Sequence, residues 1–99
     1  MSDPPLFTIL TASLNSATTI DKSLHSVRKQ TFQNLEHIIV DGGSDDRTIE
    51  IIKQHEKFYN LIWLSEPDNG IAEALNKGIE RASGKYILAS AMHSLMSAF

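Results

Sequence analysis

A cluster of acidic and small residues follows an apolar run near the middle of the chain, where residues 41–46 read Asp-Gly-Gly-Ser-Asp-Asp. A carboxylate fixed at the end of a buried strand can accept a hydrogen bond from an N–H group of a base or from a ribose hydroxyl. Glycine beside it lets the backbone approach a ligand closely. Asp41, Gly42 and Asp46 are therefore candidate nucleotide-binding residues. Capping is the alternative role, favoured for at least one of Asp45 and Asp46.

A shorter polar cluster ends the first apolar run, where residues 11–15 read Thr-Ala-Ser-Leu-Asn. Short polar side chains at the carboxyl end of a strand can hold a base or a ribose, which makes Thr11, Ser13 and Asn15 candidate binding residues. Spacing alone favours a simple polar loop, so both interpretations stay open.

The third cluster, residues 66–70, reads Glu-Pro-Asp-Asn-Gly and precedes a segment with helical periodicity. The free N–H groups at a helix amino terminus favour phosphate, and Asp68 is a candidate to face the nucleoside. Lys77, farther along the helix, would offset the charge of a diphosphate if it reaches the ligand. A solvated position on the helix surface is the other, favoured interpretation of Lys77.

Secondary-structure elements must position these clusters, and apolar runs alternate with helical patterns along the chain. Strict alternation predicts an α/β fold with a parallel sheet and right-handed crossovers, so that all strand ends meet at one edge. That edge is where ligands bind in open α/β sheets. The predicted strands are residues 6–11, 35–41, 61–65 and 85–90, and the predicted helices are residues 20–29, 47–57 and 71–83.

The helix over residues 71–83 has the clearest apolar stripe in the sequence. Such a stripe is expected to pack against the sheet. Gly84 is well placed to end the helix in a left-handed conformation. The stripe consists of Ile71, Ala72, Leu75, Ile79 and Ala82.

Composition limits the class of protein. The net charge is -3 and the nine Lys and Arg residues are scattered, which argues against a nucleic-acid partner. With 99 residues and no cysteine, the chain is expected to be a single domain without disulfides or thiolate metal sites. No apolar run approaches the roughly 20 residues of a membrane span, and residues 1–5 lack the pattern of a signal peptide. A cytoplasmic location is expected, with peripheral attachment to the inner membrane left open.

The four histidines show no metal-ligand spacing along the sequence, so structural or exposed positions are expected for them. The sequence also lacks a glycine-rich dinucleotide fingerprint and a Walker-type phosphate loop. The four histidines are His25, His37, His55 and His93.

Two of the clusters resemble signatures of glycosyltransferase family 2. Residues 38–46 resemble its first nucleotide-sugar signature, in which a strand ends in Asp, small residues, Ser and another Asp. Residues 66–78 resemble its acidic-Asn-Gly loop and the Asn-Lys-Gly helix that follows. The likeness runs from about Phe7 to Leu88, most of the chain.

The resemblance implies that residues 1–99 form the nucleotide-sugar-binding half of a GT-A-type glycosyltransferase. It implies a three-layer, Rossmann-like half domain with a mostly parallel four-stranded sheet in the order 3-2-1-4. The expected partner is a nucleoside-diphosphate sugar, with a UDP-sugar favoured. Asp41 would read the base, while Asn15, Asp46 and Asp68 would support the nucleoside.

The sequence departs from the family pattern after the fourth predicted strand. The family carries an Asp-x-Asp element there that binds a divalent metal, Mg or Mn, whereas this chain reads Ala91-Met92-His93. Alanine has no ligand atom, and a lone His suits a hard cation poorly. The metal ligands are therefore expected to be absent, no catalytic base can be named, and the isolated chain is expected to be inactive. A non-catalytic nucleotide-binding module and an assembly module from a truncated gene are the alternatives.

The last residues, 91–99, form a divergent apolar tail with a helical stripe. The stripe would cover the protein's own sheet edge or form a self-associating surface, since half of a larger sheet leaves an open edge. We expect a homodimer or a complementing polypeptide. The stripe consists of Met92, Leu95, Met96 and Phe99.

Overall fold

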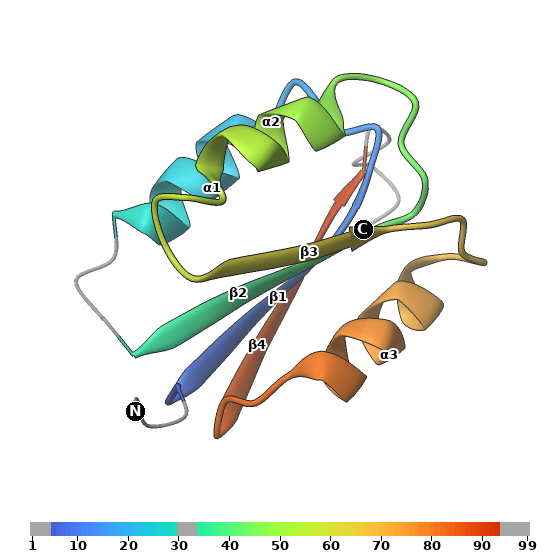
Figure 1. Cartoon of the computed structure of the whole chain (residues 1–99). Coiled ribbons are helices and arrows are strands. Elements are labelled where there is room, and N and C mark those ends of the chain that lie inside the picture. The colour runs from blue at the N-terminus through green and yellow to red at the C-terminus, as the bar shows by residue number, and fades with distance from the viewer. Residues whose placement is uncertain (1–4, 30–33, 94–99) are drawn as a thin grey trace.

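The computed structural model describes residues 5–29 and 34–93, which form a parallel four-stranded sheet with three helices (Figure 1). The sheet has the order β3-β2-β1-β4, and each neighbouring pair is parallel. This order confirms the α/β fold and the 3-2-1-4 topology predicted from the sequence. The strands are β1 (Phe7–Leu14), β2 (Leu35–Asp41), β3 (Leu61–Ser65) and β4 (Tyr86–His93).

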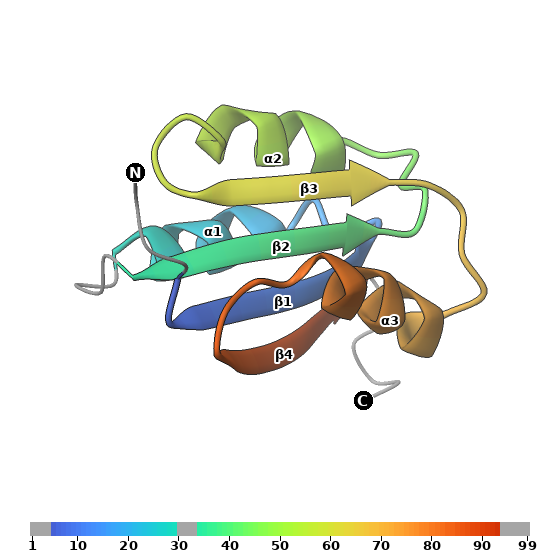
Figure 2. The same ribbon diagram turned by 60° about the horizontal axis from the view of Figure 1, so that its bottom comes forward.

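The helices α1 (Ile20–Arg28), α2 (Thr48–His55) and α3 (Ile71–Arg81) cover both faces of the sheet. Figures 1 and 2 show α1 and α2 on one face and α3 on the other. All seven residues of β2 are buried, because this central strand is covered on both faces. Ile38 and Val40 pack toward α3, whereas Ile39 packs against residues of α1 and α2. None of the helices within residues 5–29 and 34–93 is long and apolar enough to cross a membrane.

The outer strand β4 is longer than the sequence predicted, because it pairs with β1 over its whole length, from Phe7↔Tyr86 to Leu14↔His93. The predicted helical stripe is therefore wrong at Met92, which lies in β4, and the rest of that stripe lies outside the described residues. Strand β1 also extends beyond the prediction, which puts Ser13 within the strand rather than in a loop.

The predicted stripe of α3 is confirmed in part, because Ile71, Leu75 and Ala82 pack against the core beside Ala74. Ala74 and Gly78 are buried, whereas Ala72 and Ile79 of the predicted stripe are exposed. Gly78 explains the difference, because a Cβ at this position would overlap the side chain of Leu10. The helix thus places the small residues Ala74 and Gly78 closest to the sheet, with Ile71 and Leu75 packing beside them.

Gly84 does not end α3 in a left-handed conformation, contrary to the prediction. The helix ends at Arg81, and Gly84 is not among the residues with positive φ. Glycine is needed there because a Cβ would lie 2.5 Å from the backbone nitrogen of Thr8. Its own N–H donates to Thr8 Oγ1 at 2.9 Å, which fixes the start of β4 against β1.

A buried carboxylate fastens the connection between α3 and β4. Glu36 in β2 accepts hydrogen bonds from Thr8 Oγ1 at 2.6 Å, the Ser83 backbone N–H at 2.7 Å and Ser83 Oγ at 3.0 Å. Burial alone raises the pKa of Glu36, but the hydrogen bonds from Ser83, Thr8 and Gly84 outweigh it and lower the pKa.

Candidate nucleotide site at the carboxyl edge of the sheet

The strand register brings three polar residues into one row at the carboxyl edge of the sheet. Ser13 in β1 lies opposite Asp41 in β2, and Asp41 lies opposite Ser65 in β3. The parallel strands thus place residues separated by more than fifty positions side by side. The clusters that the sequence predicted to converge do meet at this edge.

Asp41 is the centre of a closed hydrogen-bond network and is fully buried. Its Oδ1 accepts from Ser13 Oγ at 2.7 Å and Ser44 Oγ at 2.6 Å. Its Oδ2 accepts from the Ser44 N–H at 2.7 Å, Ser65 Oγ at 2.9 Å and the Gly43 N–H at 3.1 Å. A carboxylate offers about four lone-pair sites, so donors within the chain already fill them. For Asp41 to read a base, some of these bonds would have to break.

Asn15 joins the loop after β1 to the loop after β2. Its backbone N–H donates to Ser44 Oγ at 2.8 Å, and its side-chain Oδ1 accepts from the Asp45 N–H at 2.9 Å. The residue has a φ of 48°, a left-handed conformation that Asn tolerates better than most residues. Both its main chain and its side chain therefore hold the two loops together.

Asp46 also connects the loop after β1 to the loop after β2, through Ala17 and Thr48. Its Oδ1 accepts from Thr48 Oγ1 at 2.5 Å and the Thr48 N–H at 2.9 Å, and its Oδ2 accepts from the Ala17 N–H at 3.2 Å. Desolvation raises the pKa of Asp46, but the bonds from Thr48 and Ala17 outweigh it and lower the pKa. Asp46 thus binds the first turn of α2, the capping role considered from the sequence.

Thr11 and Lys77 lie apart from this network. The Oγ1 of buried Thr11 lies 2.9 Å from His37 Nε2, and His37 Nδ1 lies 2.7 Å from the Tyr59 hydroxyl. Lys77 Nζ lies 3.0 Å from Glu66 Oε1 and 3.5 Å from Glu73 Oε1. The hydrogen bond to Glu66 is the largest of the effects that raise the pKa of Lys77.

Asp68 is the predicted site residue with an unused acceptor. Its Oδ1 accepts from the Gly70 N–H at 3.0 Å, whereas its Oδ2 is buried and has no hydrogen-bond partner among the described residues. The carboxylate faces Gly42, where an added Cβ would lie 3.2 Å from both oxygens. A buried acceptor without a donor is unfavourable by about 1–3 kcal/mol. A ligand N–H group would remove this cost.

The edge does not fit a divalent metal of the kind the family resemblance implies. Among the described residues, Asp41 and Asp46 are bonded within the chain, and Ala91 near the end of β4 has no ligand atom. Hard cations require several oxygen ligands. Among the described residues, the one group of three possible ligands that lie close together is on α1 and α2 and not at this edge.

A surface hollow occurs elsewhere on the molecule. It contains no carboxylate, so it offers no acceptor of the kind that would read an N–H group of a base. None of the predicted nucleotide-binding residues lines it. Its lining residues are Thr18, Thr19, Lys22, Ser23, Ser26 and Val27.

Sequence reasoning missed Ser44 and Ser65 as partners of Asp41 and missed the approach of Gly42 to Asp68. Ser65 ends its strand, so its place beside Asp41 follows once the register is known. His25 is exposed and His37 and His55 are buried, in agreement with the expectation for these histidines, but spacing along the chain gave no sign that the fold brings His25 and His55 together, with ring centroids 4.8 Å apart.

Comparisons with known proteins agree with this geometry. Residues 8–90 match the family described as Glycosyl transferase family 2. The uncharacterized glycosyltransferase Rv1514c of Mycobacterium tuberculosis is 36% identical over 85 residues, which cover 85% of this chain and 32% of that protein. A PGL/p-HBAD biosynthesis glycosyltransferase of Mycobacterium bovis is 35% identical over 86 residues, 85% of this chain and 34% of that protein. The chain spans about a third of the length of these relatives.

Solved structures share the fold. TarS residues 1–349 of S. aureus, in complex with UDP-GlcNAc, matches with a TM-score of 0.81 and 26% identity over 86% of this chain and 26% of that chain. The mannosyltransferase PcManGT of Pyrobaculum calidifontis, in complex with GDP-Man and Mn2+, matches with a TM-score of 0.79 and 25% identity over 91% of this chain and 28% of that chain. With the family match over most of its length and this sheet topology, the chain belongs to glycosyltransferase family 2.

Proposed function

We propose that this chain is the nucleotide-binding half of a family 2 glycosyltransferase and binds a UDP-sugar at the carboxyl edge of the sheet. The family match and the nucleotide complexes of TarS and PcManGT support a sugar nucleotide as the ligand. The edge also combines rigid strand ends with two glycine-containing loops, at residues 42–46 and 66–70. Such an edge suits a ligand that carries many hydrogen-bonding groups.

The unpartnered Oδ2 of Asp68 is the observation on which this proposal depends. The N3–H of uracil is a donor that a fixed carboxylate oxygen can bind, and the proposal assigns Asp68 to this contact. The oxygen is buried against Gly42, so the ligand must enter as the loop at residues 66–70 moves away from Gly42. Because Gly42 has no side chain, the ligand can occupy the space that a larger residue at this position would fill.

The other candidate residues are proposed to shape the edge. Asp41 with Ser13 fixes the ends of β1 and β2, while Asn15 and Asp46 hold the neighbouring loops. Lys77 is paired with Glu66, at the start of the loop at residues 66–70, so we assign it to holding that loop and to balancing charge near the diphosphate. Thr11 supports β1 from within, through its contact with His37.

Calorimetry tests the Asp68 assignment. UDP is titrated into the wild-type chain and into Asp68→Asn, which replaces the unpaired acceptor by an amide of nearly the same shape. Asp45→Asn is the matched control, since Asp45 is an exposed acid at the same edge. The expected result is a loss of about tenfold or more in UDP affinity for Asp68→Asn and little change for Asp45→Asn, as one charged hydrogen bond is worth roughly 1.5–3 kcal/mol. Equal affinities of all three proteins would reject the assignment, and tighter binding of GDP would reject the preference for uridine.

We further propose that the isolated chain does not transfer the sugar. Among the described residues, no group of three possible metal ligands lies at this edge. An assay for UDP release from UDP-GlcNAc, with and without Mn²⁺, tests this. Turnover above the rate without protein would overturn it.

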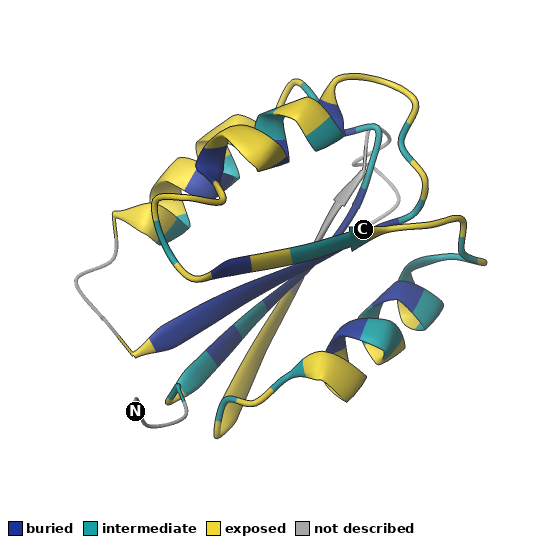
Figure 3. Cartoon of the chain, viewed as in Figure 1, coloured by how far each residue is buried: buried dark blue, intermediate teal, exposed yellow. Residues whose placement is uncertain are grey.

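An assembly role is the second candidate function, because β4 is poorly covered. Tyr86, Ile87 and Leu88 are 51%, 41% and 56% exposed, and since successive strand residues point to opposite faces, neither face of β4 is covered there (Figure 3). Within residues 5–29 and 34–93, β4 is also an edge strand of the sheet, and an edge strand offers its outer backbone groups for pairing. We propose that a second copy of the chain pairs at β4. Sedimentation should show a dimer that Leu88→Lys weakens, whereas a monomer at all concentrations would favour a complementing polypeptide instead.

A further inference from the structure

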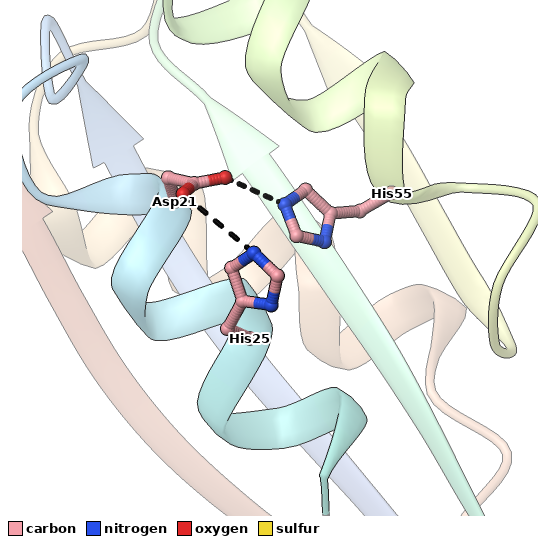
Figure 4. A group of neighbouring side chains, drawn as sticks. All are labelled: Asp21, His25 and His55. Atoms are coloured by element: carbon pink, nitrogen blue, oxygen red, sulfur yellow. Dashed lines mark hydrogen bonds and ion pairs between the residues drawn. The ribbon is translucent and has the colours of Figure 1, made fainter.

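The helices α1 and α2 bring together three side chains that the nucleotide site does not use. Asp21 and His25 lie one turn apart on α1, and His55 is the last residue of α2 (Figure 4). Asp21 Oδ1 lies 2.8 Å from His55 Nε2, and Asp21 Oδ2 lies 3.7 Å from His25 Nε2. One ligand atom from each residue lies within 4.8 Å of the others.

His55 is buried, yet its hydrogen bonding is incomplete. Only 3% of the residue is exposed, and while its Nε2 meets Asp21, its Nδ1 has no partner among the described residues. When Nε2 carries the proton that Asp21 accepts, Nδ1 keeps an unused lone pair. A metal at Nε2 requires the other tautomer, with the proton on Nδ1, and no donor among the described residues faces Nδ1 to oppose it.

The remaining two ligands are accessible. The side chains of Asp21 and His25 are 54% and 47% exposed, so an ion can reach the cluster from solvent without opening the core. The Nε2 atoms of His25 and His55 face different oxygens of the Asp21 carboxylate, and the two ring planes are nearly perpendicular, at 85°. Perpendicular rings suit convergence on one point between the helices.

We propose that Asp21, His25 and His55 form a site for a zinc-class transition metal, with one imidazole nitrogen from each histidine, one carboxylate oxygen and water as ligands. Two histidines and one carboxylate are a common donor set for Zn²⁺ with an open fourth position. Tetrahedral zinc places its nitrogen and oxygen ligands about 3.3 Å apart. The 2.8 Å and 3.7 Å distances here are to the two different oxygens of Asp21, so the carboxylate would turn to place one oxygen near both nitrogens. Imidazole nitrogen favours such a metal over Mg²⁺ or Ca²⁺.

The metal would connect α1 to α2. The two helices already pack together through Ile20, Leu24 and Ile52, so the ion would add a second link on the solvent side of that contact. This site is built from helices on one face of the sheet, whereas the proposed nucleotide site is built from strand ends and loops. A failed test of one proposal therefore leaves the other untouched, because the two sites share no residue.

Calorimetric titration of the full 99-residue chain with zinc chloride tests the site. His25→Ala removes an exposed ligand, and Glu50→Gln is the control because it removes an exposed charge from α2 outside the cluster. The expected result is one Zn²⁺ per chain for the wild type and for Glu50→Gln. The zinc affinity of His25→Ala should be lower by about tenfold or more, because loss of a residue that only supports a metal ligand already lowers metal affinity by about 10–100-fold.

Cobalt provides a second measurement. Co²⁺ bound at the cluster should give the strong visible absorption of four-coordinate cobalt in the wild type and in Glu50→Gln, and the absorption should be lost in His25→Ala. Asp21→Asn should behave as His25→Ala does, with circular dichroism to verify that it is folded. Absence of zinc binding by the wild type, or equal zinc affinity in the wild type and His25→Ala, would overturn the proposal and leave the cluster as a hydrogen-bonded contact between helices.

Discussion

Replacement of Asp41 should damage the frame of the edge rather than remove a simple ligand contact. Asp41→Ala removes the acceptor of five hydrogen bonds. The three serine hydroxyls among the donors can rotate toward other acceptors, but the backbone N–H groups of Gly43 and Ser44 are fixed. Gly43 is exposed and Ser44 is half-buried, so water can reach these N–H groups. A net hydrogen bond is worth about 0.5–1.5 kcal/mol, so the loss of these two alone accounts for roughly 1–3 kcal/mol of stability.

Asp41→Asn should be milder. Its side-chain oxygen can stay toward the two fixed N–H groups while its amide faces the hydroxyls of Ser13 and Ser44, which can turn to accept. Hydrogen bonds to the neutral amide oxygen are weaker by about 1 kcal/mol each than bonds to the carboxylate. This loss of stability is partly offset because the folded protein no longer buries a charge. We expect a net loss of roughly 1–2 kcal/mol.

Urea unfolding followed by circular dichroism measures these differences. The free energy of unfolding should fall in the order wild type, Asp41→Asn, Asp41→Ala, with Asp45→Asn within about 0.5 kcal/mol of the wild type as an exposed control. An Asp41→Ala protein as stable as the wild type would refute the network as a structural frame. The result also matters for binding studies, because lost nucleotide affinity in Asp41→Ala would reflect a distorted edge.

Three further predictions follow from buried or tightly packed groups. Burial lowers the pKa of His37 from 6.5 to about 4, so the unfolded chain binds more protons than the folded chain between these pH values. The free energy of unfolding should therefore fall by about 3 kcal/mol as the pH drops from 6.5 toward 4. The urea midpoint should depend less steeply on pH in His37→Gln than in the wild type. Gly84→Ala should lose more than about 2 kcal/mol in thermal unfolding, because its Cβ would lie 2.5 Å from the Thr8 nitrogen. Gly42→Ala has no left-handed backbone to strain, so its stability should change by less than about 1 kcal/mol while calorimetry shows weaker UDP binding, since the Cβ crowds Asp68.

Local patterns in the sequence were sufficient for the topology. Alternating apolar runs and helical stripes predicted the order of elements, and the rule that parallel strand ends share an edge predicted that Ser13 and Asp41 meet. The extent of β4 was not predictable in the same way, because it depends on pairing with β1 along its full length and not on its own residues. The face of α3 was predicted only in part, because hydrophobicity does not report how closely a small residue such as Gly78 lets a helix approach.

The chemistry of the edge depended on contacts between distant residues. Asp41 has the sequence position of a base-reading acid, but Ser65, twenty-four residues away, helps to fill its lone pairs. The unpaired oxygen of Asp68 could not be foreseen, because it results from what fails to contact that atom. Likewise, His25 and His55 are thirty residues apart and meet only through the packing of α1 on α2.

The most direct test of the proposed function is a crystal structure of the chain with UDP. The account predicts a uracil ring at the carboxyl edge of the sheet with its N3–H within hydrogen-bond distance of Asp68 Oδ2, while the serine and backbone donors of Asp41 stay in place. A uracil bound directly to Asp41 in place of those donors, or bound in the hollow along α1, would contradict it.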